Sequence, residues 1–135
     1  MSPLQKALSI IDERSKNETE RGTAFDNLAK IFFENDAIQT QQYSKVWHFS
    51  DWAKEQDKEN VDDIGIDLVA ELSDGSGFCS IQCKYYAADH PISKKDIDSW
   101  VSASSTSEFV RMVLVDSTSV SIGSKLSSEV HIRAL

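Results

Sequence analysis

Two apolar and β-branched runs, separated by a short polar cluster, dominate the pattern of hydrophobic and polar positions along the chain. They cover residues 65–71 and 78–84, and the cluster at residues 73–77 contains Asp, Ser and Gly. This arrangement is typical of a β-hairpin. Side chains alternate between the two faces of a strand, so if the apolar sets share one face, Asp67, Gln82 and Lys84 share the other.

The rest of the chain alternates between helical and strand patterns. Helical spacing of apolar residues predicts helices over residues 3–13 and about 19–36, and a capping pattern at Ser93 predicts the start of another. Residues 39–45 are predicted as a polar loop and 45–49 as a strand, followed by a helical turn or loop from residue 50. The apolar run 108–116 predicts a strand buried on both faces. A short helix at 122–128 and an edge strand at about 130–133 complete the prediction.

These elements predict an α/β fold with a mixed central sheet and helices on both sides. The hairpin supplies an antiparallel pair, and a helix between the hairpin and strand 108–116 favours a parallel crossover. A length of 135 residues fits one domain. No apolar run is long enough to span a bilayer, and the start of the chain lacks an export signal, so we expect a cytoplasmic protein without membrane contact.

The two cysteines are predicted to be reduced core residues. Cys79 and Cys83 lie on the same predicted strand, where their separation of about 13 Å is too large for a disulfide. No second cysteine pair accompanies them, so a structural zinc site is not expected.

An acid, an amide and a lysine at the open end of the hairpin suit a hard divalent cation. Mg²⁺ prefers oxygen ligands and keeps several waters, so one or two carboxylates are sufficient. A neighbouring ammonium can orient a water and stabilise charge that develops on a phosphate. The residues alone also fit a polar surface on which Asp67 and Lys84 form an exposed cross-strand ion pair.

The amino-acid sequence of the hairpin resembles that of a known catalytic hairpin. Gly-Ile-Asp-Leu-Val-Ala followed by Ile-Gln-Cys-Lys-Tyr-Tyr is similar to the PD-(D/E)xK nuclease superfamily, in particular its Mrr-like branch. Within that branch it is most similar to the nuclease domain of type ISP restriction enzymes and predicted helicases. Ile66 replaces the proline and Gln82 replaces the acid of the superfamily's name, and both departures are usual in the Mrr-like branch.

The resemblance implies a restriction-endonuclease-like three-layer core and Mg²⁺- or Mn²⁺-dependent hydrolysis of DNA in restriction of foreign DNA. It implies that Asp67 binds the metal directly, that Gln82 binds it or its water, and that the Cys83 backbone carbonyl adds an oxygen. Lys84 would position or polarise the attacking water. Asp26 would supply an acid from the second predicted helix, and Glu20 competes with it for that role.

Partners follow from the same resemblance. The densest basic and aromatic patch consists of Lys84, Tyr85, Tyr86, Lys94 and Lys95. Lys94, Lys95 and Tyr85 are candidate DNA contacts, although two solvated lysines explain the patch equally well. We expect residues 1–135 to be a single nuclease-like domain of a larger enzyme with helicase-like motor and methyltransferase domains. A net charge of −8 opposes DNA binding. A non-cleaving nucleic-acid-binding module and a protein-interaction module on the same fold therefore remain alternatives.

Overall fold

The computed structural model describes residues 3–58, 65–85, 93–117 and 131–134. Its strands form one five-stranded sheet in the order β1-β2-β3-β4-β5. The elements in chain order are α1 (Pro3–Arg14), α2 (Glu18–Asn35), α3 (Ala37–Gln42), β1 (Tyr43–His48), α4 (Phe49–Glu55), β2 (Leu68–Leu72), β3 (Phe78–Lys84), α5 (Lys94–Ala103), β4 (Phe109–Asp116) and β5 (His131–Ala134). None of the described helices is both long and apolar enough to cross a membrane.

The sheet is mixed, as the sequence predicts. β1, β2 and β3 form an antiparallel meander, in which Leu68 lies opposite Ile81. β3 and β4 are parallel, and α5 connects them in the sequence. β5 pairs antiparallel with the outer side of β4 and ends the sheet, which confirms the predicted edge strand.

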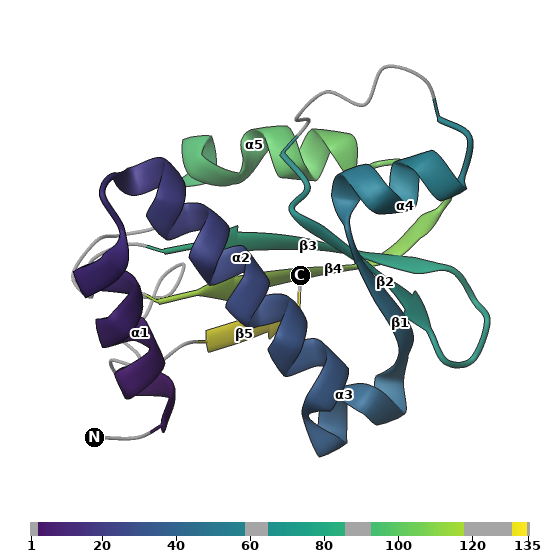
Figure 1. Cartoon of the computed structure of the whole chain (residues 1–135). Coiled ribbons are helices and arrows are strands. Elements are labelled where there is room, and N and C mark those ends of the chain that lie inside the picture. Colours follow the sequence, from purple (N-terminus) through teal and green to yellow (C-terminus); the bar gives the residue numbers. More distant parts are fainter. Residues whose placement is uncertain (1–2, 59–64, 86–92, 118–130, 135) are drawn as a thin grey trace.

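Helices cover both faces of this sheet, so its core has two layers (Figure 1). On one side, α2 crosses the sheet and buries Phe25, Ala29 and Phe33 against alternate residues of β2, β3 and β4. On the other side, Trp52 of α4 and Trp100 of α5 pack with the remaining alternate residues. The predicted α/β architecture with helices on both sides is therefore confirmed. The carboxyl half of β4 is buried on both faces, as its continuous apolar run predicts.

The segment before β1 differs from its prediction as a polar loop. Residues 37–42 form helix α3 because the Asp36 carboxylate caps it, accepting hydrogen bonds from the Ile38 and Gln39 backbone nitrogens at 3.1 and 3.2 Å. β1 then begins at Tyr43 rather than Lys45, and Phe49 opens α4 instead of ending the strand. The predicted helix at 122–128 lies outside the described residues.

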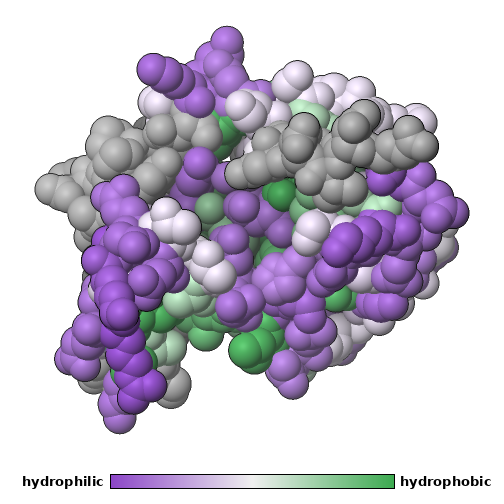
Figure 2. All heavy atoms as spheres, turned by 45° about the horizontal axis from the view of Figure 1, so that its top comes forward, coloured by the Kyte–Doolittle hydropathy of each residue, from purple (hydrophilic) through white to green (hydrophobic). Residues whose placement is uncertain are grey.

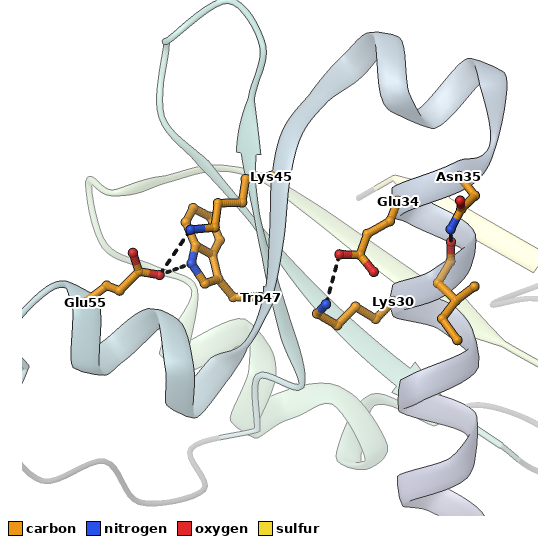
Figure 3. A network of polar contacts seen from close by, with 7 residues as sticks. Lys30, Glu34, Asn35, Lys45, Trp47 and Glu55 are labelled. Carbon is orange, nitrogen blue, oxygen red and sulfur yellow. Dashed lines mark hydrogen bonds and ion pairs between the residues drawn. The ribbon is translucent and has the colours of Figure 1, made fainter.

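Polar contacts between β1 and α4 hold the outer strand to the helix that follows it. The Trp47 indole nitrogen donates a hydrogen bond to Glu55, and the Lys45 ammonium lies 3.5 Å from the same carboxylate and 4.8 Å from the centre of the Trp47 ring (Figure 3). Trp47 and Trp52 are both buried. These tryptophans are therefore core residues.

Candidate active site

A pocket of about 390 Å³ opens at the carboxyl end of β3, between α2 and α5. It is lined by residues from four separate parts of the chain, namely Gly22, Asp26, Gly65, Asp67, Gln82, Cys83, Lys84, Ser99 and Trp100. Figure 2, which brings the top of Figure 1 forward, shows that the middle of this face is hollowed and that hydrophilic side chains gather in the hollow. The structure thus brings Asp67, Gln82 and Lys84 together in one pocket at the open end of the hairpin.

Asp67 is held in place by three hydrogen bonds just before β2 begins. Its backbone nitrogen donates to the Ile81 carbonyl, and its own carbonyl accepts from the Phe49 nitrogen, each at 3.0 Å. Its Oδ2 accepts from the Cys83 backbone nitrogen at 2.8 Å. The Asp67 carboxylate therefore accepts a hydrogen bond that a backbone carbonyl would accept if β2–β3 pairing continued. This hydrogen bond fixes the carboxylate beside β3, the strand that carries Lys84.

Gln82 joins the lysine to the loop before β2. Its side chain is buried, and its amide satisfies both neighbours when Nε2 donates to the Gly65 carbonyl and Oε1 accepts from Lys84 Nζ at 3.3 Å. The Lys84 backbone carbonyl also accepts from the Ser117 nitrogen at 3.1 Å, next to the end of β4. An amide oxygen and an ammonium therefore lie in contact inside the pocket, rather than on an exposed polar surface.

Asp26, and not Glu20, is the acid that α2 brings to the pocket. The ligand atoms of Asp26, Asp67 and Cys83 all lie within 4.8 Å of one another. Asp26 follows Phe25, which is buried against the sheet, so packing of that ring sets the orientation of this part of the helix. Glu20 lies in the groove between α1 and α2, where its carboxylate accepts from the Lys16 nitrogen.

The Cys83 thiol is a component of the site, although the sequence predicts it only as a core residue. Its sulfur lies with the two carboxylates. Burial raises the pKa of this thiol well above its usual value, and the neighbouring Asp67 and Asp26 raise it further. Cys79 and Cys83 are both buried and free, as predicted.

Gly65 lets the chain enter the pocket close to α5. It has a φ of +90°, and a Cβ at this position would lie 2.9 Å from the Trp100 backbone nitrogen and 3.0 Å from Ser99 Cβ. Helix α5 is fixed in turn by buried hydrogen bonds: the Trp100 indole nitrogen donates to Ser80 Oγ at 3.0 Å, and Ser80 Oγ lies 2.6 Å from Ser104 Oγ. The sequence signal for this contact was the glycine directly before Ile66-Asp67.

A family model described as restriction endonuclease matches residues 34–132, well over half of the chain. The chain belongs to this family. The match covers Asp67 and the Gln82–Lys84 segment of this restriction endonuclease domain, whereas Gly22 and Asp26 precede it. The resemblance to Mrr-like nucleases is confirmed at the level of the family.

A solved structure supports the fold of the domain. The ATP-dependent type ISP restriction-modification enzyme LlaBIII bound to DNA matches with a TM-score of 0.57 and 24% sequence identity. The alignment covers 80% of this chain but 6% of that enzyme, so the domain corresponds to a small part of its length. No match is found among curated proteins.

The three candidate DNA contacts lie in different surroundings. Lys94 and Lys95 are exposed in the first turn of α5. The Tyr85 ring stacks on Phe25 with ring centres 5.2 Å apart, and its hydroxyl donates to the Leu8 carbonyl at 3.3 Å. Burial, together with the nearby Asp12, raises the pKa of Tyr85 to about 12. Tyr85 thus contacts α1 and α2, while the two lysines remain open to solvent.

Proposed function

We propose that this restriction endonuclease domain hydrolyses DNA phosphodiester bonds with Mg²⁺ or Mn²⁺, in restriction of foreign DNA. The observation that carries the proposal is the convergence of Asp26, Asp67 and Lys84 in one pocket. An acid from a helix, an acid held against a strand edge and a lysine on the adjacent strand give opposite charges within one cavity. This pocket therefore contains groups that can bind a cation, a phosphate and a water.

The donor atoms fit a hard divalent cation. Asp26 and Asp67 place carboxylate oxygens within 4.8 Å of one another, and Mg²⁺ needs few protein ligands because it retains waters. The Cys83 thiol is a softer ligand, and its raised pKa keeps it protonated at neutral pH. We therefore assign ligation to the two carboxylates, with the Gln82 side-chain oxygen and the Cys83 backbone carbonyl as additional oxygens.

Each residue has a distinct part in the proposed hydrolysis. The bound cation would supply Lewis-acid stabilisation of charge on the phosphate and lower the pKa of a water. Lys84 would orient the attacking water and stabilise the developing negative charge. Gln82 contacts Lys84 through its oxygen, so it would hold the ammonium in position. Asp67 would keep its own position through the Cys83 backbone nitrogen.

The negative charge of the chain bears on how DNA would reach this pocket. A net charge of −8 disfavours binding to a polyanion, because affinity for DNA depends on phosphates neutralised by Lys and Arg. We propose that Lys94 and Lys95 make local phosphate contacts, and that most DNA affinity comes from other parts of a longer enzyme. Helicase-like motor and methyltransferase domains are the partners that we propose for it.

A plasmid-nicking assay tests the proposal. We expect slow, sequence-independent nicking that requires Mg²⁺ or Mn²⁺ and stops on addition of a chelator. Lys84→Ala should abolish it while metal binding, measured by calorimetry, persists. Lys58→Ala is the matched control, because Lys58 pairs with Glu108 at 2.8 Å away from the pocket lining. Equal nicking by wild type and Lys84→Ala would refute the assigned site, and metal-independent nicking would refute the mechanism.

A further inference from the structure

A glycine occupies helix α2 beyond its first turn, where the fold gives no packing reason for it. Gly22 lies inside α2 (Glu18–Asn35), and glycine is less favourable than alanine in the interior of a helix. Among the residues that the structure describes, a Cβ built at Gly22 meets nothing within 4 Å. Its φ is not positive, unlike those of Gly65, Gly75 and Gly77. Neither close packing nor an unusual backbone conformation therefore requires glycine at this position.

The location of Gly22 suggests another reason. It lines the same pocket as Asp26, Asp67 and Lys84. Gly22 and Asp26 are four residues apart on one helix and therefore share a face. Side chains on a helix lean toward its N-terminus, so Asp26 lies over the turn that contains Gly22. A side chain at position 22 would stand beside that acid, in space that is open in this structure.

We infer that Gly22 is a specificity-determining position, which leaves room for the sugar-phosphate backbone of a polynucleotide to approach the two carboxylates. This inference rests on the proposed nuclease function. The missing side chain leaves open space at the α2 side of the pocket rim, and Ser99 of α5 lines the same pocket. A polymer must pass over that rim with nucleotides on both sides of the scissile phosphate, whereas a small phosphodiester enters without crossing it.

The test compares a large and a small substrate in variants of graded bulk. Gly22→Ala and Gly22→Leu are assayed on supercoiled plasmid and on bis(4-nitrophenyl) phosphate, with Mn²⁺ affinity measured by calorimetry. Plasmid cleavage should fall about threefold in Gly22→Ala and at least about tenfold in Gly22→Leu, which are barrier increases of about 0.7 and 1.4 kcal/mol. Hydrolysis of the small diester and Mn²⁺ affinity should stay within about twofold of wild type.

The midpoint of thermal unfolding is a second measurement. If Gly22 had a structural role, its substitution would lower this midpoint. Gly22→Ala should raise the midpoint by roughly 4 °C, because alanine favours the helix, while plasmid cleavage falls. Asn27→Leu is the control for added bulk, since Asn27 is exposed on α2 and lies in the groove facing α1. Its plasmid cleavage should equal that of wild type.

Several results would overturn the inference. Wild-type rates of plasmid cleavage by folded Gly22→Leu would show that the open space is irrelevant, and Gly22→Ala decides the matter if the leucine variant does not fold. Equal losses on both substrates, with weakened Mn²⁺ binding, would assign Gly22 to the metal site. If wild type cleaves plasmid but not the small diester, Mn²⁺ affinity alone separates these cases. Absence of metal-dependent hydrolysis by wild type would instead refute the proposed function, and the inference with it.

Discussion

The two ends of the β2–β3 hairpin are built in different ways, although the same two strands form both. At the closed end, local turn chemistry joins the strands. The Leu72 nitrogen donates to the Gly77 carbonyl at 3.0 Å, Gly75 has a φ of +76°, and Asp74 Oδ1 accepts from the Ser76 nitrogen at 2.9 Å. Every one of these contacts joins residues that are close in sequence.

At the open end, contacts between distant segments replace the turn. Asp67 Oδ2 accepts from the Cys83 nitrogen at 2.8 Å, Gly65 lies against the backbone of α5, and Asp26 arrives from α2. Both ends thus contain an aspartate that accepts from a backbone nitrogen and a glycine with positive φ. The turn residues at the closed end are exposed, although the flanking Ser73 and Phe78 nitrogens donate to the Gln42 and Glu108 carbonyls. The open end contacts α2 and α5 and encloses a pocket. Similar residue types therefore acquire structural or chemical roles according to what surrounds them.

The largest expected effect separates the two aspartates. Asp67→Asn keeps an oxygen that can accept from the Cys83 nitrogen but removes the charge, so metal-dependent cleavage should fall at least about a thousandfold, or about 4 kcal/mol of barrier. Asp74→Asn, the same substitution at the closed end, should cleave like wild type. Plasmid nicking measured beside thermal unfolding distinguishes the two. Comparable losses in both variants would show that the hairpin matters only as a scaffold.

The two cysteines of β3 should be equally inert despite their different distances from the pocket. Burial raises the pKa of Cys79 to about 12 from the usual 9.0 and raises that of Cys83 as well. Native thiols should therefore react at pH 8 at least about a hundredfold more slowly with an alkylating reagent than thiols in urea, because the thiolate is the nucleophile.

The raised pKa of Cys79 also determines the direction in which stability changes with pH. The Cys79 thiol loses its proton near pH 9 in the unfolded chain and only near 12 in the native protein, so its contribution to stability is fully present below pH 9 and is lost as the pH rises between these values. Denaturant unfolding at pH 8, 9.5 and 10.5 checks this. A Cys79→Ala variant should lose part of the pH dependence of stability. In the labelling experiment, rapid alkylation of the native thiols would contradict the assigned burial.

The two glycines should differ in the free energy of unfolding. Gly65→Ala meets both a φ of +90° and the α5 backbone at 2.9 Å, so it should destabilise the fold by about 3 kcal/mol. Gly75→Ala meets a φ of +76° but open space, and should cost about 1 kcal/mol. Equilibrium denaturation measures both values. Equal destabilisation would mean that the contact with α5 yields easily.

A change of about tenfold in metal affinity is expected at Gln82. Gln82→Glu adds negative charge at the site and should tighten Mg²⁺ binding by about tenfold, equivalent to about 1.4 kcal/mol. Gln82→Leu removes the oxygen and should weaken binding by a similar factor. Metal titration calorimetry on wild type and both variants, with unfolding as a control, tests this. Identical affinities in folded proteins would remove Gln82 from the site.

Three features could be predicted from the sequence: the hairpin, the meeting of Asp67, Gln82 and Lys84 at its open end, and the mixed sheet around them. Side-chain alternation has a period of two residues, so a hairpin of known register fixes which residues share a face. The apolar stripe of α2 was also predictable, because Phe25 and Phe33 repeat at the spacing of a helix. Helix α3 was missed because its cap, Asp36, was assigned to the preceding helix.

The packing of separate elements decides which acid of α2 reaches the pocket and what else lies in it. Glu20 and Asp26 are both helix carboxylates in sequence, and the packing of Phe25 on the sheet turns one toward Asp67 while the other faces α1. The Cys83 thiol, the approach of Gly65 to α5 and the open space at Gly22 likewise depend on how separate elements pack. Periodicity specifies faces within an element, but distances between elements arise from packing, and the pocket is made of those distances.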